Sequence, residues 1–267
     1  SIKLEYINMF EDIESRYEGN LHIHALSLQS GKEWKYREAD VVATASTIKL
    51  PILMHAAKCV EDGYLSWDTE VTLTDSDKVG GMGVLQNFKT PHRMTLHDAC
   101  YLMTAISDNT ATNLVIDILG VENINQFIRV FNINETRLNR KAFSPDNEQS
   151  RVYGLGQTTA TNMLKLLKAI YRPEYLSKDV TSDIQWMLSK QTDLVGIPRV
   201  LPNGWVYAGK TGRVLDVRGD VGYVKSLDGR EWLLSMFSYG LTSPNWTIEN
   251  EGLLAIAEAT RRILELE

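Results

Sequence analysis

The sequence predicts an α/β fold in which the two ends of the chain form one part and the middle forms another. Strand-like runs occur near both termini, and segments with helical periodicity lie between them. Because a sheet cannot bury its own face, the terminal segments should meet in one unit with helices packed on it. We expect an α/β subdomain from residues 1–40 and 195–267, an all-α subdomain from residues 41–194, and a functional site in the cleft between them.

The N-terminal elements are a helix and a pair of strands. Apolar residues recur at helical spacing through residues 4–17, and the pattern changes to period two over residues 21–28. Ser30, Gly31 and Lys32 then form a turn signal. We therefore predict a second strand that ends near Ala39.

The middle of the chain favours helices. A wide apolar stripe begins at Thr44, with Pro51 early enough to lie in a first turn. This places Ser46 at a helix N-terminus, where the macrodipole favours a developing negative charge. A second helical run, residues 95–118, breaks around Ser107–Asn109. Further helices are predicted for residues 121–131, 160–170 and 182–191, with a polar, irregular stretch at 132–157.

The C-terminal part returns to strands. Three short β-like runs, two turns and a closing amphipathic helix are expected there. The strands cover residues 205–209, 220–225 and 231–239, the turns 212–214 and 227–229, and the helix 247–266.

Composition excludes several classes of function. The chain has 267 residues, 43% of them hydrophobic, which is enough for a sizeable core. A formal net charge of -6 gives no basic footprint for nucleic acid or an anionic membrane. No apolar run approaches the ~18 residues of a membrane-spanning helix, and the first residues lack the apolar core of a signal peptide. The five histidines show no zinc-like pairing with cysteine or carboxylate, so we expect no metal site. We also expect no cofactor, and we expect the protein to be a monomer.

The most informative residues are Ser46 and Lys49, because two three-residue motifs later in the chain belong to the same set. Residues three apart on a helix lie on one face, so the lysine amine can reach the serine hydroxyl. This is one way to make serine a nucleophile without histidine. Alone the pair is a weak signal, since a capping serine and a surface lysine share this spacing. Ser107-Asp108-Asn109 and Lys210-Thr211-Gly212 follow in order, and the ordered set is far stronger.

This ordered set resembles the motifs of the class A β-lactamases, which are penicillin-recognising serine enzymes. The resemblance covers nearly the whole chain and is sharpest at 46–50, 107–114 and 208–212. It implies a five-stranded antiparallel sheet flanked by terminal helices, plus an all-α subdomain. It also implies a serine hydrolase, linked to antibiotic resistance, that acts on a β-lactam or a peptidoglycan-like substrate. Export to the bacterial periplasm or medium is a further implication, although no signal peptide is visible in this chain.

The resemblance implies a role for each reacting group. Ser46 would be the acylating nucleophile, Lys49 a proton acceptor or relay, and Ser107 the shuttle that carries the proton to the leaving nitrogen. Two lysines near one serine, Lys49 and Lys210, should repel each other. This repulsion lowers the pKa of the less paired lysine and favours a neutral amine base.

Substrate-binding roles follow from the same resemblance. Asn109 would hold the substrate's side-chain amide, and the Lys210-Thr211-Gly212 strand would bind its carboxylate. The backbone N–H groups of Ser46 and Arg213 would bind the oxyanion. Arg218 is a candidate second contact to the carboxylate, and the alternative is a surface arginine on a strand.

One position departs from the family pattern. In class A enzymes, a glutamate that activates the deacylating water follows the Thr-Arg-Leu-x-Arg element by two residues. Here residues 136–140 lead to Lys141 and Ala142. A redesigned loop could bring in Glu148 or Asp146, although Glu148 could equally be a solvated loop residue. Loss of such a base should slow the step it serves by ~10²–10⁴-fold.

Four interpretations follow. We favour a serine β-lactam hydrolase with slow deacylation. The alternatives are a penicillin-binding or sensing protein with a long-lived acyl adduct, and a D-alanyl-D-alanine peptidase or esterase-type hydrolase. A purely structural protein would leave the ordered motifs unexplained.

The two cysteines should stay reduced. Some class A enzymes bridge the position of Cys100 to one seven residues after the nucleophile, and Leu53 occupies that position here. Cys59 lies six residues further along the same helix, a displacement of about 9 Å. Bridged cysteines need Cα atoms within ~7 Å of each other.

Thiol titration of the unfolded, unreduced protein tests this expectation. Two free thiols per chain are expected, because the predicted Cα separation is too long for a bridge. A count of zero would defeat the distance argument.

Overall fold

The computed structural model describes residues 2–267, and the chain divides into two compact units. Unit 1 comprises the chain up to Thr47, together with Thr158–Lys168 and Asp193–Glu267. Unit 2 comprises Ile48–Gln157 and Ala169–Thr192. Within the described part of the chain, no helix is long and apolar enough to cross a membrane.

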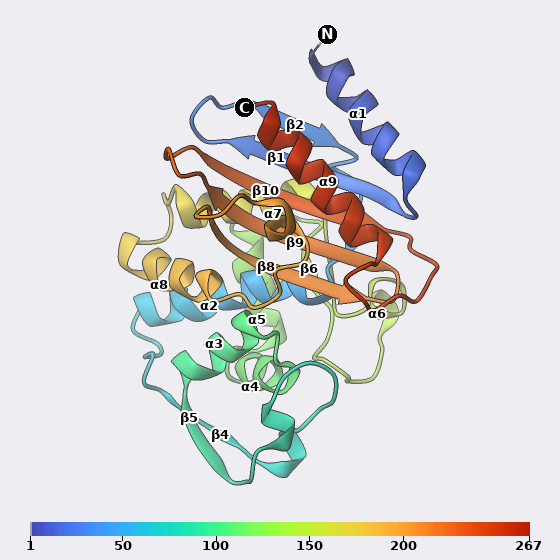
Figure 1. Ribbon diagram of the computed structural model, residues 1–267. Helices are drawn as coiled ribbons and strands as arrows, with labels where there is room; N and C mark the ends of the chain where they lie inside the picture. Colours follow the sequence, from blue (N-terminus) through green and yellow to red (C-terminus); the bar gives the residue numbers. More distant parts are fainter. Residues whose placement is uncertain (1) are drawn as a thin grey trace. The chain divides into compact units, whose positions relative to one another are not determined.

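A five-stranded antiparallel sheet organises unit 1, in the order β2-β1-β10-β9-β8 (Figure 1). The N-terminal β1 pairs with the C-terminal β10, so that Asn20 lies opposite Tyr239. The predicted antiparallel sheet is confirmed. Its strands are β1 (Asn20–Ser27), β2 (Glu33–Tyr36), β8 (Val206–Val214), β9 (Val217–Lys225) and β10 (Glu231–Tyr239).

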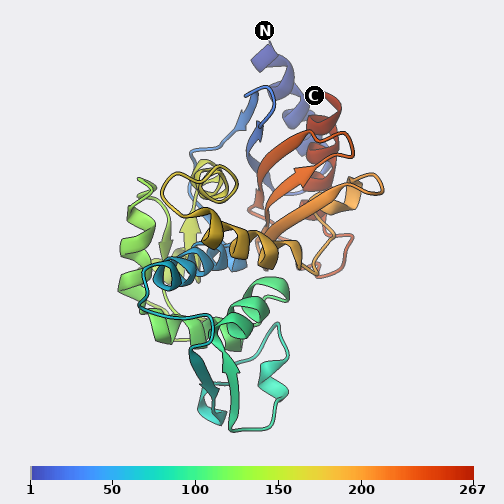
Figure 2. The ribbon, with the colours of Figure 1, turned by 90° about the vertical axis from the view of Figure 1, so that its left-hand side faces the viewer.

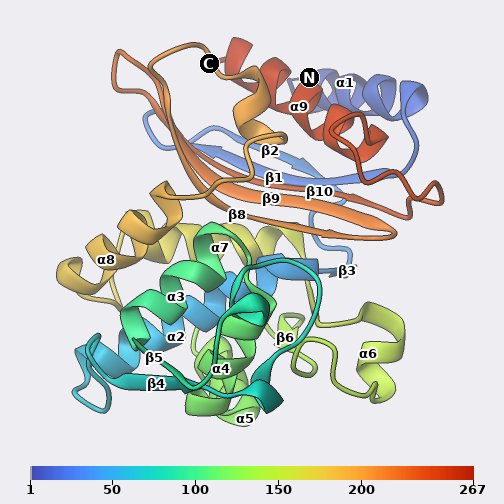
Figure 3. The ribbon, with the colours of Figure 1, turned by 60° about the horizontal axis from the view of Figure 1, so that its bottom comes forward.

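The terminal helices α1 (Ile2–Arg16) and α9 (Glu251–Glu265) pack side by side on one face of this sheet (Figure 3). Apolar residues of both helices and of the sheet form one core cluster there. The predicted closing helix begins later than residue 247, because the Asn250 side chain accepts hydrogen bonds from the N–H groups of Gly252 and Leu253 and so caps α9. Fully buried members of the cluster include Phe10, Ile13, Trp34, Trp232 and Ile256.

Helix α2 (Lys49–Glu61) is the centre of unit 2. It contacts the four helices around it, and its residues from Leu50 to Met54 are all buried (Figure 2). Pro51 lies in the first turn of α2, as predicted. The surrounding helices are α3 (Leu96–Ala105), α4 (Asn109–Leu119), α5 (Val121–Arg129) and α8 (Lys178–Ser189).

The helical run at residues 95–118 breaks where the sequence predicts. α3 ends at Ala105 and α4 begins at Asn109, with Ser107 between them at φ 58. Asp108 caps α4 by accepting a hydrogen bond from the N–H of Ala111 (2.9 Å). The predicted helices near 121–131, 160–170 and 182–191 are also present, as α5, α7 (Ala160–Tyr171) and α8.

Several short elements were not predicted. In unit 2, β4 (Glu70–Leu73) and β5 (His92–Thr95) form an antiparallel pair. The stretch 132–157 contains β6 (Arg137–Leu138) paired with β7 (Gly156–Thr158), and the short helix α6 (Glu148–Tyr153). The remaining elements are β3 (Val42–Ala43) and the 3-10 turns η1 (Ala45–Ile48), η2 (Asp75–Asp77), η3 (Leu85–Asn87) and η4 (Ile197–Val200).

The predicted turn at residues 212–214 is wrong. β8 continues to Val214, and the chain turns at Leu215 and Asp216 before β9. Gly212 serves a close approach of backbones rather than a turn, because a Cβ there would lie 2.8 Å from the Ser46 nitrogen. The predicted hairpin turn at residues 227–229 is present, with Gly229 at φ 88.

Cys59 and Cys100 are both free, which confirms the expectation from their spacing. Cys100 is fully buried, and burial raises the pKa of its thiol. Cys59 is partly exposed, and its Sγ lies 3.6 Å from the Nε2 of His55.

Candidate active site

Ser46 lies in η1, the 3-10 turn that leads directly into α2. The turn is closed by Thr47, whose N–H (3.1 Å) and hydroxyl (2.7 Å) both donate to the Thr44 carbonyl. Ala45, just before the serine, has φ 45, a conformation that residues other than glycine rarely adopt. The serine is therefore held half-buried at the N-terminal end of α2.

Strand β8 approaches this turn closely within unit 1. A Cβ at Gly212 would lie 2.8 Å from the Ser46 nitrogen, 2.8 Å from the Thr44 oxygen and 2.9 Å from the Thr47 nitrogen. Backbone atoms cannot yield as a flexible side chain can, so this contact requires glycine. The structure thus brings the Lys210-Thr211-Gly212 motif next to Ser46, as the sequence predicts.

Lys210 lies on the same strand face as Gly212, because side chains alternate along β8. Its side chain is fully buried, and its Nζ donates a hydrogen bond to the Thr211 carbonyl (2.6 Å). Burial lowers the pKa of Lys210 to about 7; the Asp193 and Asp220 carboxylates oppose this shift, and Arg213 adds to it. We predicted repulsion between two lysines as the cause of a lowered pKa, whereas burial is the main cause here.

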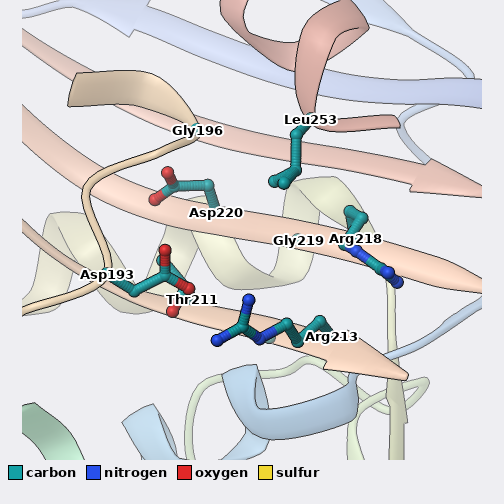
Figure 4. A pocket seen from close by; sticks show the side chains of 9 residues that line it. Asp193, Gly196, Thr211, Arg213, Arg218, Gly219, Asp220 and Leu253 are labelled. Atoms are coloured by element: carbon teal, nitrogen blue, oxygen red, sulfur yellow. The ribbon is translucent and has the colours of Figure 1, made fainter. Parts of the chain in front are cut away.

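A pocket in unit 1 lies beside this motif. Figure 4 shows the carboxylates of Asp193 and Asp220 and the guanidinium groups of Arg213 and Arg218 around it. Arg213 and Arg218 are directly opposite each other in the register of β8 and β9. The other residues that line the pocket are Gly196, Thr211, Gly212, Gly219 and Leu253.

Arg218 is 1% exposed, so the alternative of a surface strand arginine is wrong. Its NH1 donates to the carbonyls of Val214 (2.5 Å) and Val217 (2.8 Å), and its NH2 donates to the carbonyl of Asn245 (2.8 Å). The guanidinium carbon lies 5.0 Å from the ring centre of Trp246. Three hydrogen bonds of the guanidinium therefore stabilise the β8–β9 turn and the loop before α9.

Asp220 is a buried acid that the sequence analysis did not single out. It accepts hydrogen bonds from the Tyr207 hydroxyl (2.5 Å) and the Ile197 N–H (2.8 Å). Burial raises the pKa of Asp220 to about 7, although these two hydrogen bonds lower it. An acid between Gly219 and Val221 in a predicted strand is the signal that could have marked it, since a buried strand position is rarely charged.

In unit 2, the amine of Lys49 joins the first motif to the second. Lys49 is fully buried, and its Nζ donates to the Ser107 hydroxyl (2.9 Å), the Ser107 carbonyl (2.9 Å) and the Asn109 Oδ1 (2.8 Å). The structure therefore brings three of the predicted site residues into one hydrogen-bond network around the fully buried Lys49.

Asp108, the middle residue of the second motif, fixes the loop before α4. Besides capping α4, its Oδ2 accepts from the N–H groups of Val84 (2.7 Å) and Leu85 (3.0 Å). A Cβ at Gly83 would lie 2.3 Å from this carboxylate, and Gly83 has φ +113. The Asp108 carboxylate thus holds the loop at residues 79–88 against the Ser107-Asp108-Asn109 turn.

The backbone at Ala142 is fixed by one side chain. Asn113 donates from Nδ2 to the Ala142 carbonyl (2.9 Å), and its Oδ1 accepts from the Ala142 N–H (2.8 Å). Ala142 itself is 6% exposed. Glu148 and Asp146, the possible substitute bases, are both exposed, and Asp146 pairs with Arg140 at 3.1 Å.

A family model described as "Beta-lactamase enzyme family" matches residues 6–266. The chain belongs to the β-lactamase enzyme family. This membership and the names of the relatives identify it as a β-lactam hydrolase that resembles the class A β-lactamases.

Relatives of this β-lactamase cover most of the chain. β-Lactamase CARB-4 of Pseudomonas aeruginosa is 27% identical over 203 residues, which is 75% of this chain and 69% of the relative. The crystal structure of a β-lactamase from Sphaerobacter thermophilus aligns with a TM-score of 0.87 and 26% identity, over 97% of this chain and 95% of that one. A point mutant of PBP-A, described as an acyl-enzyme complex with penicillin G, aligns with a TM-score of 0.85 and 25% identity, over 97% of this chain and 96% of that one.

Replacement of Gly212 by alanine tests the contact between β8 and the Ser46 turn. Gly212→Ala should lower the free energy of unfolding by about 1–3 kcal/mol, because its Cβ meets backbone atoms, and should reduce the rate at which penicillin labels Ser46. Urea unfolding and mass spectrometry measure the two effects. Gly80→Ala is the matched control, since a Cβ there meets nothing within 4 Å; equal losses in both variants would refute a specific role for Gly212.

The pH dependence of stability tests the protonation of Asp220. Burial raises its pKa from 3.8 to about 7, so between these values the folded protein holds a proton that the unfolded chain has released. The resulting stabilisation is present at acid pH and is lost as the pH rises through about 7. Asp220→Asn should flatten this loss in urea unfolding measured from about pH 4 to 8, whereas Asp228→Asn, at an exposed turn, should not. An unchanged slope in Asp220→Asn would contradict a neutral buried acid.

Proposed function

We propose that this β-lactamase is acylated at Ser46 by β-lactams and releases the acyl group slowly. The observation that carries the proposal is the buried network at Lys49, whose amine donates to both Ser107 and Asn109. Lys49 follows Ser46 by three residues, and Ser46 lies in the turn that enters α2. A lysine amine so placed is the group that such a serine needs for activation.

Acylation proceeds by attack of the Ser46 Oγ on the lactam carbonyl carbon. For this step Lys49 must be a neutral amine, which has two N–H donors and one lone pair, so it gives up one of its three hydrogen bonds. The lone pair takes the hydroxyl proton of Ser46. Lys49 then passes a proton through the Ser107 hydroxyl to the lactam nitrogen as the C–N bond breaks, and is neutral again. Asn109 donates to the amide of the substrate's acyl side chain. The tetrahedral oxyanion accepts from the N–H groups of Ser46 and Arg213.

The substrate carboxylate is assigned to Lys210, Thr211 and Arg213. Arg218 receives a positioning role, because three of its hydrogen bonds go to backbone carbonyls. The shared site that the sequence predicts for the two subdomains stays a prediction.

Slow release of the acyl group follows from Ala142. Alanine has no basic side chain, and it occupies the position at which the family has its glutamate. Asn113 holds its backbone by two hydrogen bonds, so the loop is ordered there. Glu148 and Asp146 are exposed, and a base in open solvent is poorly placed to orient one water molecule.

A long-lived adduct is the second candidate outcome. The similarity to PBP-A, one of whose mutants is described as an acyl-enzyme complex with penicillin G, favours it. A D-alanyl-D-alanine peptidase uses the same acylation, with an amine or water as the acceptor. We also propose export from the bacterial cytoplasm, on the resemblance to class A enzymes.

Intact-mass spectrometry after mixing with benzylpenicillin tests acylation. We expect one adduct per chain, located on the Ser46 peptide, and none in Ser46→Ala. No adduct in the wild-type protein, together with no turnover, would refute the proposed nucleophile.

Product release measured in the first turnovers tests slow deacylation. We expect a burst of one product per enzyme and then a slow steady state, and Ala142→Glu should raise the steady-state rate without much change in the burst. Glu148→Gln is the decisive comparison. If it abolishes turnover and leaves the burst intact, the loop has supplied its own base and a defective deacylase is excluded.

A further inference from the structure

Phe143 follows Ala142 and is the most unusual residue of its loop. It has φ 60, and its side chain is 64% exposed. A non-glycine residue in the left-handed region costs on the order of 1–2 kcal/mol. A large apolar side chain gains little from burial at this exposure. Neither backbone preference nor core packing therefore accounts for phenylalanine here.

The ring of Phe143 lies against the loop that borders the second motif. A Cβ at Gly81 would lie 3.0 and 3.1 Å from two atoms of the Phe143 ring, and 2.7 Å from the Nδ2 of Asn109. Gly81 has φ +76 and carries no side chain that would separate the two. The ring and the Asn109 amide are therefore neighbours across one glycine.

The Asn109 side chain is oriented by its other contacts. Its Oδ1 accepts from the Lys49 Nζ at 2.8 Å, which identifies the oxygen. Within residues 2–267, its Nδ2 donates one long hydrogen bond of 3.4 Å, to the Gly80 carbonyl. The Asn109 Nδ2 thus lies on the side of Gly81 and Phe143. Of its two N–H donors, the one not given to Gly80 can be offered to a ligand carbonyl.

We propose that Phe143 forms an aromatic wall for the substrate's acyl side chain and gives the enzyme a preference for aromatic side chains. This inference rests on the proposed function, in which Asn109 donates to the side-chain amide. A carbonyl bound at the Asn109 Nδ2 carries its substituent into the space beside the Phe143 ring. Aromatic groups gain from offset or edge-to-face contact with such a ring, and a small aliphatic group gains much less.

Two penams that share one nucleus separate this contact from the rest of binding. One carries a phenylacetyl side chain and the other an acetyl side chain. For the wild-type protein, the second-order rate constant of Ser46 acylation should be on the order of 3- to 10-fold larger for phenylacetyl. Phe143→Ala should remove most of this ratio by slowing acylation with the phenylacetyl penam alone, and Phe143→Tyr should keep it.

Two further variants guard against a purely structural effect. Phe143→Gly relieves the positive φ, so its melting temperature should not fall, yet its aromatic preference should be lost. Val152→Ala is the matched control, because Val152 is 65% exposed and lies on α6; its ratio should equal that of the wild type.

The outcomes separate the two proposals. If neither penam labels Ser46, the proposed function fails. If both penams label Ser46 and Phe143→Ala leaves the ratio unchanged, or slows both penams equally, the aromatic wall is overturned while the acylation chemistry stands.

Discussion

A fully buried lysine amine must be surrounded by hydrogen-bond acceptors, and much of unit 2 is arranged to supply them to Lys49. Its three acceptors come from Ser107, which lies in the sharp break between α3 and α4, and from Asn109, the first residue of α4. The break requires Ser107 to adopt a positive φ. Asp108 stabilises it with hydrogen bonds to α4 and to the loop that follows Gly83. The loop residues Val84 and Leu85 therefore help to hold the acceptors of the Lys49 amine in place, through their hydrogen bonds to Asp108.

The two buried lysines of this protein are accommodated in different ways. Lys49 has three acceptors at hydrogen-bond distance, whereas burial dominates at Lys210 and lowers its pKa to about 7. The buried carboxyl group of Asp220 has its own pKa raised to about 7 by the same desolvation. The charge around β8 and β9 is consequently sensitive to pH near neutrality.

The order of motifs predicts neighbours that the structure brings together, Gly212 with Ser46 and Lys49 with Ser107 and Asn109. The catalytic roles of these residues stay predictions. Glycines in β8 misled the strand prediction, since a turn and a close backbone approach favour the same residue. The strands β4 and β5 are only four residues long, too short for a clear alternation. Phe143 could not have been found by pattern, since its importance comes from a positive φ and from a glycine distant in sequence.

The topology of the sheet in unit 1 has a consequence for how the chain folds as it is synthesised. β1 leaves the ribosome long before β10, the strand that pairs along its whole length. Unit 2 consists mainly of one continuous stretch, Ile48–Gln157, whose contacts are local in comparison. Pairings between distant segments form slowly, because the intervening chain must first be brought together. The helical unit can thus assemble before the sheet that carries the Lys210-Thr211-Gly212 strand, because that sheet is completed only after β10 has been synthesised.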